Sequence, residues 1–334
     1  MTRTTLKGQV SLALAKTLLT ALALTTLAAV PATAQVFPNK PLRVVVPQPP
    51  GGGFDFVGRL LADRLSKQMA QPVVVENRPG SGTLLGTDAV AKAVPDGYTL
   101  LVGSISNLAI NPGLYRNLPY DSLRDFEPVG LAVAYSYTLM ARKDLPFNSL
   151  KDLVAHAKVN AGKLTYASAG NGSGQHVLAA ALWHLAGVEL VHVPYRGAQA
   201  AYQDLLGGRV DVFFDLSPTA RVQVDAGTVK ALAVSGSARL AAHPEVPTLK
   251  ETGVAALELE SWFGLFIPAK TPADVATRLR ADLAKVIASP DVIDIFRKAG
   301  GRPLALSAVD TRALVKRDVD RWTKLTRELS IKVD

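Results

Sequence analysis

The stretch that decides the fold is Pro47-Gln48-Pro49-Pro50-Gly51-Gly52-Gly53-Phe54-Asp55. It follows an apolar run, residues 42–46, which predicts a buried parallel strand. It precedes apolar residues at i+4 spacing from Val57 to Met69, which predict an amphipathic helix. Glycines let the main chain approach a ligand with no Cβ in the way. Because the first N–H groups of a helix are unpaired and its dipole is positive there, this turn predicts an anion-binding site.

A glycine-rich turn can also serve only to change the direction of the chain. Two observations favour a ligand site here. Pro-Pro-Gly-Gly-Gly is longer than a tight turn needs, and a similar glycine-rich loop, residues 168–174, lies between a second predicted strand and helix. No Gly-Lys-Ser/Thr follows the three glycines, so the turn is not a P-loop and nucleotide hydrolysis is disfavoured.

The N-terminal segment predicts export. Residues 1–34 combine a positively charged start, an apolar run from Leu18 to Val30, and Ala32-Thr33-Ala34 before Gln35. This pattern is typical of a signal peptide cleaved after Ala34, and a retained anchor is the alternative. The chain of 334 residues has no cysteine, which excludes disulfides, thiolate nucleophiles and cysteine-metal sites.

The chain is basic, with a formal net charge of +9. Its lysines and arginines are scattered beside acids, and no basic run contains interleaved aromatic residues. We therefore expect no nucleic-acid partner, although a mild positive field helps to attract anionic solutes. The five histidines show no metal-ligand spacing, so we expect neither a metal nor a cofactor.

Strands and helices alternate in two series, which predicts an α/β fold of two doubly wound sheets. Two long apolar segments, residues 127–142 and 260–268, are expected to cross between the sheets. Three further helices from residue 272 onward are expected to cover a face of the first sheet. The expected boundaries are residues 35–135 and 245–334 for lobe 1 and residues 136–244 for lobe 2, with crossovers near 128–142 and 230–266.

Other segments give weaker indications. Ser104 and Asn107 follow the predicted strand at residues 98–103, where they either contact a ligand or cap a turn. The pattern Gly80-x-Gly82-x-x-x-Gly86 has the wrong spacing for a dinucleotide site, and we interpret it as a loop that packs a helix. Asp55 is expected either to interact with the helix dipole from the first turn, as a purely structural residue, or to contact the ligand or brace the glycine turn.

An enzyme would need a triad, and Ser173, His176 and Asp215 are the candidates. Gly172-Ser173-Gly174 lacks the Gly-x-Ser-x-Gly spacing of a hydrolase, so Ser173 is better interpreted as a helix N-cap. His176 is then either a ligand contact or a polar residue at an interface, and Asp215 is a weaker ligand-contact candidate. We therefore expect a binding protein with no catalytic residues.

The chain resembles the extracytoplasmic solute receptors of the tripartite tricarboxylate transporter type, also called the Bug family. The resemblance covers the whole chain after residue 35. The matching blocks are Lys40-Pro41-Leu42-Arg43-Val44-Val45-Val46-Pro47, Pro50-Gly51-Gly52-Gly53-x-Asp55, Val73-Val74-Val75-Glu76-Asn77-Arg78-Pro79-Gly80, Pro95-Asp96-Gly97-Tyr98-Thr99-Leu100-Leu101, Ala109-Ile110-Asn111-Pro112-x-Leu114-Tyr115, His192-Val193-Pro194-Tyr195-Arg196-Gly197, Gly207-Gly208-x-Val210-Asp211 and Trp262-Phe263-Gly264-Leu265.

The resemblance implies a monomeric, two-lobed periplasmic binding protein (type II-like, a Venus flytrap) that closes on a small organic carboxylate. It also implies delivery of that carboxylate to a two-part membrane permease, and signalling to a membrane sensor kinase is the alternative. The expected ligand contacts are Pro49, Pro50, Gly51, Gly52, Gly53, Phe54, Asp55, Ser104, Asn107, Ala169, Gly170, Asn171, Gly172, Ser173, His176 and Asp215.

Two residues depart from the family pattern. Gln48 stands where an aromatic residue is common, and Phe54 stands where a small or hydroxyl residue is frequent. Phe54 is expected to line the pocket with apolar surface, which leaves room for an aromatic or bulkier acid.

Overall fold

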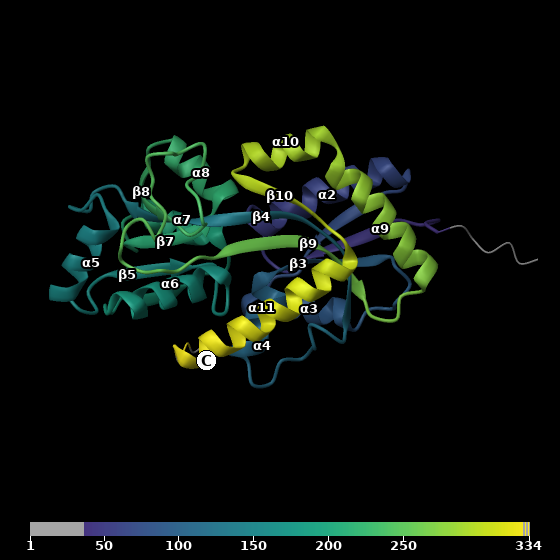
Figure 1. Cartoon of the computed structure of the whole chain (residues 1–334), viewed down its shortest axis with the longest axis horizontal. Helices are drawn as coiled ribbons and strands as arrows, with labels where there is room; N and C mark the ends of the chain where they lie inside the picture. Colours follow the sequence, from purple (N-terminus) through teal and green to yellow (C-terminus); the bar gives the residue numbers. More distant parts are fainter. Residues whose placement is uncertain (1–36, 330, 332, 334) are drawn as a thin grey trace, which may run out of the picture. The chain divides into compact units, whose positions relative to one another are not determined.

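Strand β4, Phe126–Arg142, organises the fold (Figure 1). Its residues Phe126–Ser136 pair antiparallel with β9, Glu260–Pro268, whereas Tyr137–Arg142 pair with β7, Val212–Leu216, and β8, Val229–Val234. The structure is a computed structural model that describes residues 37–329, 331 and 333. The predicted signal peptide and its cleavage site lie outside these residues.

All ten strands in the described part of the chain belong to one continuous sheet, in the order β2-β1-β3-β9-β4-β7-β5-β6, with β8 and β10 also paired to β4. We call the part around β1 the first sheet half and the part around β5 the second sheet half. In the first half β1 pairs parallel with β2 and β3, and in the second half β5 pairs parallel with β6 and β7. The remaining strands are β1, Leu42–Val46; β2, Val73–Asn77; β3, Thr99–Ser104; β5, Thr165–Ser168; β6, Val191–Pro194; and β10, Gly301–Leu306.

The helices occupy nearly all the predicted positions. They are α2, Gly53–Met69; α3, Leu84–Ala91; α4, Asn111–Leu114; α5, Leu150–Val159; α6, Gly174–Ala186; α7, Ala198–Leu206; α8, Ser217–Asp225; α9, Ala273–Ala288; α10, Pro290–Lys298; and α11, Ala308–Glu328, with a 3₁₀ turn η1, Ser81–Thr83, and a π turn η2, Ser106–Ile110. Helices α4 and α8 and strand β10 have no counterpart in the sequence prediction.

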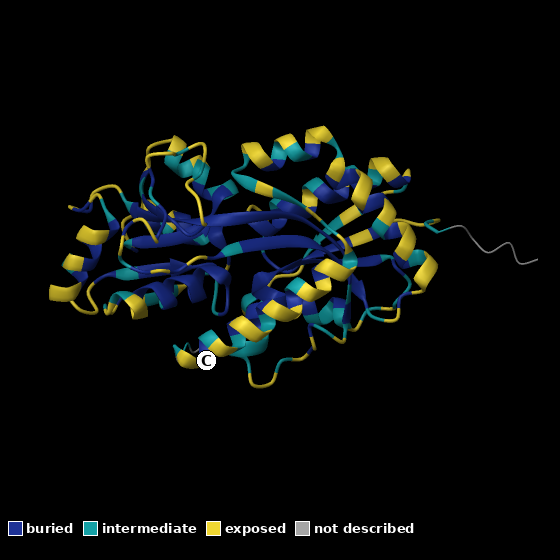
Figure 2. Ribbon diagram, in the orientation of Figure 1, coloured by how far each residue is buried: buried dark blue, intermediate teal, exposed yellow. Residues whose placement is uncertain are grey.

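Burial follows the sequence pattern. Helix α2 buries Val57, Leu61, Leu65 and Met69, which are the residues at i+4 spacing. Strand β4 is buried along almost its entire length because it lies inside the sheet with helices on its faces (Figure 2). Helices α9 and α11 pack on β4, as expected for the C-terminal helices.

Residues from Lys40 onward form one compact unit, which holds every element above. No helix in the described part of the chain is both long enough and apolar enough to cross a membrane.

Candidate functional site

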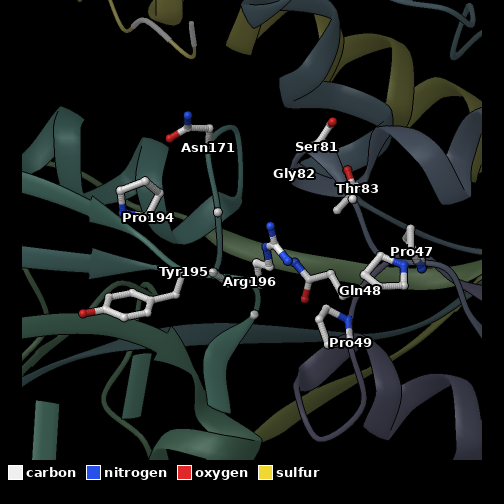
Figure 3. Close-up of a pocket in the computed structure, with 15 residues that line it drawn as sticks. Pro47, Gln48, Pro49, Ser81, Gly82, Thr83, Asn171, Pro194, Tyr195 and Arg196 are labelled. Atoms are coloured by element: carbon white, nitrogen blue, oxygen red, sulfur yellow. The ribbon is translucent and has the colours of Figure 1, made fainter. Parts of the chain in front are cut away.

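A cavity of about 590 Å³ lies where four loops meet (Figure 3). Residues 47–49 and 79–83 follow β1 and β2 in the first sheet half, and residues 169–171 and 194–197 lie at the ends of β5 and β6 in the second half. All four loops are at the carboxyl ends of parallel strands, which is where open α/β sheets bind ligands. The volume is in the usual range for a small-molecule site.

The cavity lining carries one charged side chain, that of Arg196. The lining residues, all of which the structure describes, are Pro47, Gln48, Pro49, Pro79, Gly80, Ser81, Gly82, Thr83, Ala169, Gly170, Asn171, Pro194, Tyr195, Arg196 and Gly197. None of them is acidic, so the chemistry of the wall suits an anion. Figure 3 shows the side chains of Gln48 and Arg196 pointing toward one another from opposite walls.

The loop after β2 holds an unusual backbone. Ser81, Gly82 and Thr83 all have positive φ, at 45°, 60° and 96°. Positive φ is uncommon for a non-glycine residue and a genuine outlier for a β-branched one such as threonine. The buried Thr83 hydroxyl accepts a hydrogen bond from Asn111 Nδ2 at 3.1 Å, which helps to hold this conformation. Such backbone strain tends to gather at ligand sites.

The two sheet halves touch beside the cavity. Gln199 Nε2 donates to the Gly51 carbonyl oxygen at 2.7 Å, and the Tyr115 hydroxyl donates to the Asn171 carbonyl oxygen at 3.3 Å. A Cβ added to Gly82 would lie 1.8 Å from that same Asn171 oxygen. The backbones of the two loops therefore approach as closely as only glycine allows, and the cavity is in a closed arrangement.

Asp55 braces the glycine turn. Its Oδ2 accepts hydrogen bonds from Gly51 N at 3.0 Å and Arg59 Nε at 2.9 Å, and its Oδ1 accepts one from Asn77 Nδ2 at 2.9 Å. Burial alone would raise the pKa of Asp55, but these hydrogen bonds outweigh burial and lower the pKa below its ordinary value. Of the sequence-based interpretations of Asp55, these contacts correspond to the brace.

Most of the predicted glycine-turn residues lie beside the cavity without lining it. Pro49 lines it, whereas Pro50, Gly51, Gly52, Gly53, Phe54 and Asp55 do not. The expectation that Phe54 lines the pocket is corrected by its position: the ring packs edge-on against Phe263 of β9, with centroids 5.0 Å apart. At the start of α2 this apolar side chain is directed to the core of the first sheet half and not to solvent.

The second glycine-rich loop is divided in the same way. Ala169, Gly170 and Asn171 line the cavity, while Gly172, Ser173 and His176 lie behind them. Ser173 is the N-cap of α6, as predicted, because its Oγ accepts a hydrogen bond from His176 N at 3.3 Å.

His176 supports the loop from behind. Its Nδ1 accepts a hydrogen bond from Gly172 N at 3.3 Å, and its ring stacks on His192 at 4.0 Å. Burial lowers the pKa of His176 to about 4, so the ring is neutral at pH 7.

The candidate triad is not assembled. Asp215 is fully buried and accepts hydrogen bonds from Gln175 Nε2 at 3.0 Å, the Tyr202 hydroxyl at 2.9 Å and the Thr219 hydroxyl. Burial raises the pKa of Asp215, and neither His176 nor Ser173 is among its partners. The Ser173 hydroxyl bonds a backbone N–H and not an imidazole.

Ser104 and Asn107 cap the turn after β3, which was the alternative to a ligand contact. Ser104 N donates to Asn107 Oδ1 at 2.8 Å, and Asn107 Nδ2 donates to the Thr87 hydroxyl at 3.0 Å. Both residues are fully buried and neither lines the cavity. Among the described residues, no group of three or more histidine or acidic side chains is placed to hold a metal ion.

Sequence reasoning missed two of the four loops. Residues 79–83 were interpreted only as a packing loop, and Tyr195-Arg196-Gly197 only as part of the family pattern. Both loops follow the carboxyl ends of predicted strands, which was the available signal, but the sequence does not show that these strands lie beside β1 and β5.

The sequence and the fold are both similar to those of known proteins. The sequence model of the tripartite tricarboxylate transporter family receptor matches residues 57–331. A protein from Pseudomonas sp. strain P51, named for the tcbD-tcbE intergenic region, is 41% identical over 314 residues, which are 92% of each chain. The structure of the periplasmic binding protein BugD superposes with a TM-score of 0.85 at 35% identity, covering 89% of this chain and 99% of BugD.

A third similar protein is Rpa4515 of R. palustris, whose structure was determined with adipate. It has a TM-score of 0.85 and 32% identity and covers 89% of this chain and 99% of its own. The matching family model describes a receptor and BugD is a periplasmic binding protein, so neither is an enzyme, and the similarity to the BugD structure confirms the expected two-lobed α/β fold. The chain therefore belongs to the receptor family of the tripartite tricarboxylate transporters, the family to which its sequence motifs pointed.

Proposed function

We propose that this receptor binds a small organic carboxylate in the cavity between the four loops. The observation that carries the proposal is the cavity wall, which is closed by both sheet halves and has Arg196 as its one charged side chain. The similarity to Rpa4515, determined with adipate, supports the same ligand class. Of the contacts expected from sequence, Pro49, Ala169, Gly170 and Asn171 are retained, and residues 81–83 and 195–196 join them.

A thermal-shift panel tests this proposal. Organic acids are compared with their neutral amides, for example adipate with adipamide, on the purified protein. A ligand at one hundred times its Kd raises the free energy of unfolding by about 2.7 kcal/mol. We expect at least one acid to shift the melting temperature while its amide does not. No shift with any acid, or equal shifts with acid and amide, would contradict carboxylate binding.

We further propose that the two lobes meet within β4. The register supports a boundary between Ser136 and Tyr137, because β4 changes partners there from β9 to β7 and β8. This boundary lies one residue beyond the expected one, which assigns residues 35–135 and 245–334 to lobe 1 and residues 136–244 to lobe 2. Distances between spin labels on the two lobes, measured with and without acid, test whether they move as rigid bodies.

The loaded receptor, in this proposal, delivers the acid to permease subunits from the periplasm, after cleavage behind Ala34. Intact mass measurement of the exported protein tests the cleavage site. Uptake of labelled acid in cells that lack the receptor tests delivery, and uptake that is unchanged while gene induction is lost would favour the sensor-kinase alternative.

A further inference from the structure

The Gln48 side chain is buried in the cavity wall without a protein partner. The residue is 6% exposed, and within the described part of the chain its amide group makes no hydrogen bond. Its backbone is fixed, because the Gln48 carbonyl oxygen accepts a hydrogen bond from Asn77 Nδ2 at 3.0 Å. Because the residue lines the cavity, this amide group is available to a ligand there.

Arg196 faces Gln48 from the second sheet half (Figure 3). Within the described residues its guanidinium has no hydrogen-bond or ion-pair partner, and no acidic residue lines the cavity to compete for it. A guanidinium presents a planar set of donors that matches a carboxylate in a bidentate pair. Arg196 is therefore available for an anionic group of the ligand.

The two side chains together present more hydrogen-bonding groups than a carboxylate alone can pair with. A carboxylate only accepts hydrogen bonds, so it can pair with the Arg196 guanidinium and the Gln48 NH₂ group but leaves Gln48 Oε1 without a donor. A ligand hydroxyl or amino group beside the carboxylate would supply that donor. Because no acid lines the cavity to balance an ammonium group, the wall favours a hydroxyl.

We propose that Gln48 and Arg196 form a polar clamp that selects 2-hydroxy acids over the same acids without the hydroxyl. Arg196 holds a carboxylate of the ligand, and the Gln48 amide accepts from the neighbouring hydroxyl while its NH₂ group donates to the carboxylate. The clamp deepens the proposed function, on which it rests, by naming the substrate class and the two residues that determine specificity.

Binding constants of matched acids test the clamp. Titration calorimetry compares pairs that differ only by a 2-hydroxyl group, namely L-malate with succinate, L-lactate with propionate, and 2-hydroxyadipate with adipate. We expect the wild-type protein to bind the hydroxy acid of the best-fitting pair about tenfold more tightly, or better. If unsubstituted acids bind and no hydroxy acid binds more tightly than its parent, the clamp is overturned while carboxylate binding stands. If no acid of any kind binds, both proposals fail.

Variants separate the two roles. Gln48→Leu, which keeps the approximate size but removes the amide, should reduce the hydroxy-to-parent affinity ratio to about one. Arg196→Met should weaken both members of the pair at least tenfold, with partial recovery in Arg196→Lys. The matched control is Arg297→Met, which removes an exposed arginine of α10 outside the cavity and should change neither constant.

Unchanged melting temperatures of the unliganded variants confirm that each one folds. A Gln48→Leu protein that keeps the wild-type ratio of hydroxy-acid affinity to parent-acid affinity would overturn the role of the amide. Equal losses of acid-binding affinity in Arg196→Met and Arg297→Met would show only a general effect of the net charge and would also overturn the clamp.

Discussion

Replacing Gly82 with alanine tests whether the cavity closes on its ligand as the structure shows. The new Cβ would lie 1.8 Å from the Asn171 carbonyl oxygen and 3.0 Å from its carbon. Since such atoms essentially never approach within 3.0 Å, the two loops must separate by about 1.2 Å. That separation disturbs the cross-cavity hydrogen bond from Tyr115 and the contacts around it.

The expected loss follows from these contacts. One net hydrogen bond contributes about 1 kcal/mol, and the packing lost beside it adds a similar amount. We therefore expect the closed state to lose about 1.5–3 kcal/mol, which weakens ligand binding roughly 10- to 100-fold. Gly82→Ala also places alanine at a φ of +60°, which costs about 1–2 kcal/mol of folding stability by itself.

Gly162→Ala is the matched control for that second effect. Gly162 has a φ of +69°, and a Cβ there would meet nothing within 4 Å. Urea unfolding should show the cost of the positive φ in both variants and a larger loss of folding stability in Gly82→Ala, while calorimetry with the acid that gives the largest thermal shift should show weakened binding only in Gly82→Ala. Wild-type affinity in Gly82→Ala would refute the reasoning, because closure would not then need this contact.

Three further predictions concern the residues behind the cavity. Burial lowers the pKa values of His176 and His192 to about 4 and about 3, below their ordinary 6.5. The folded protein therefore has its full free energy of unfolding from these neutral rings above pH 6.5 and loses that contribution as the pH falls. At pH 5 the loss is about 2 kcal/mol per histidine, and urea unfolding of His192→Asn should show a smaller decline than wild type. Asp55→Asn should lower the free energy of unfolding at pH 7 by about 1–3 kcal/mol, because hydrogen bonds to a charged acceptor are lost. Since the pKa of Asp55 is depressed in the folded protein, the stability advantage of the wild type should persist above pH 3.8 and disappear as the pH falls below that value. A stability difference that stays constant down to pH 2 would contradict the assigned brace. Gly52→Val should fold normally, because its Cβ would meet only Gln48 Oε1 at 3.8 Å, but should weaken acid binding because the branched side chain presses on that amide. Unaltered affinity in calorimetry would contradict this.

Local sequence patterns were sufficient for most elements of the fold. The i+4 spacing of α2 predicts its buried face, and the Ser173 N-cap follows from its position before α6. The length of the apolar run that became β4 predicted a strand shared by two sheets, since one sheet half cannot use 17 residues. In each case the deciding interaction lies within a few residues or along one strand.

The site itself depends on contacts between distant segments. Residues 79–83 reach the cavity because β2 pairs with β1, and Arg196 reaches it because β6 pairs with β5. The sequence of a single segment does not show which strands will be its neighbours in the sheet. Phe54 shows the same limit, because its direction is set by Phe263, more than two hundred residues later in the chain.

The central claim is that the loops after β1, β2, β5 and β6 enclose one small carboxylate. A crystal structure of the protein with the acid that gives the largest thermal shift tests it most directly. We predict that the acid lies between Gln48 and Arg196, with carboxylate oxygens within about 3.2 Å of the Arg196 guanidinium nitrogens. An acid bound elsewhere on the protein, with only water in this cavity, would contradict the claim.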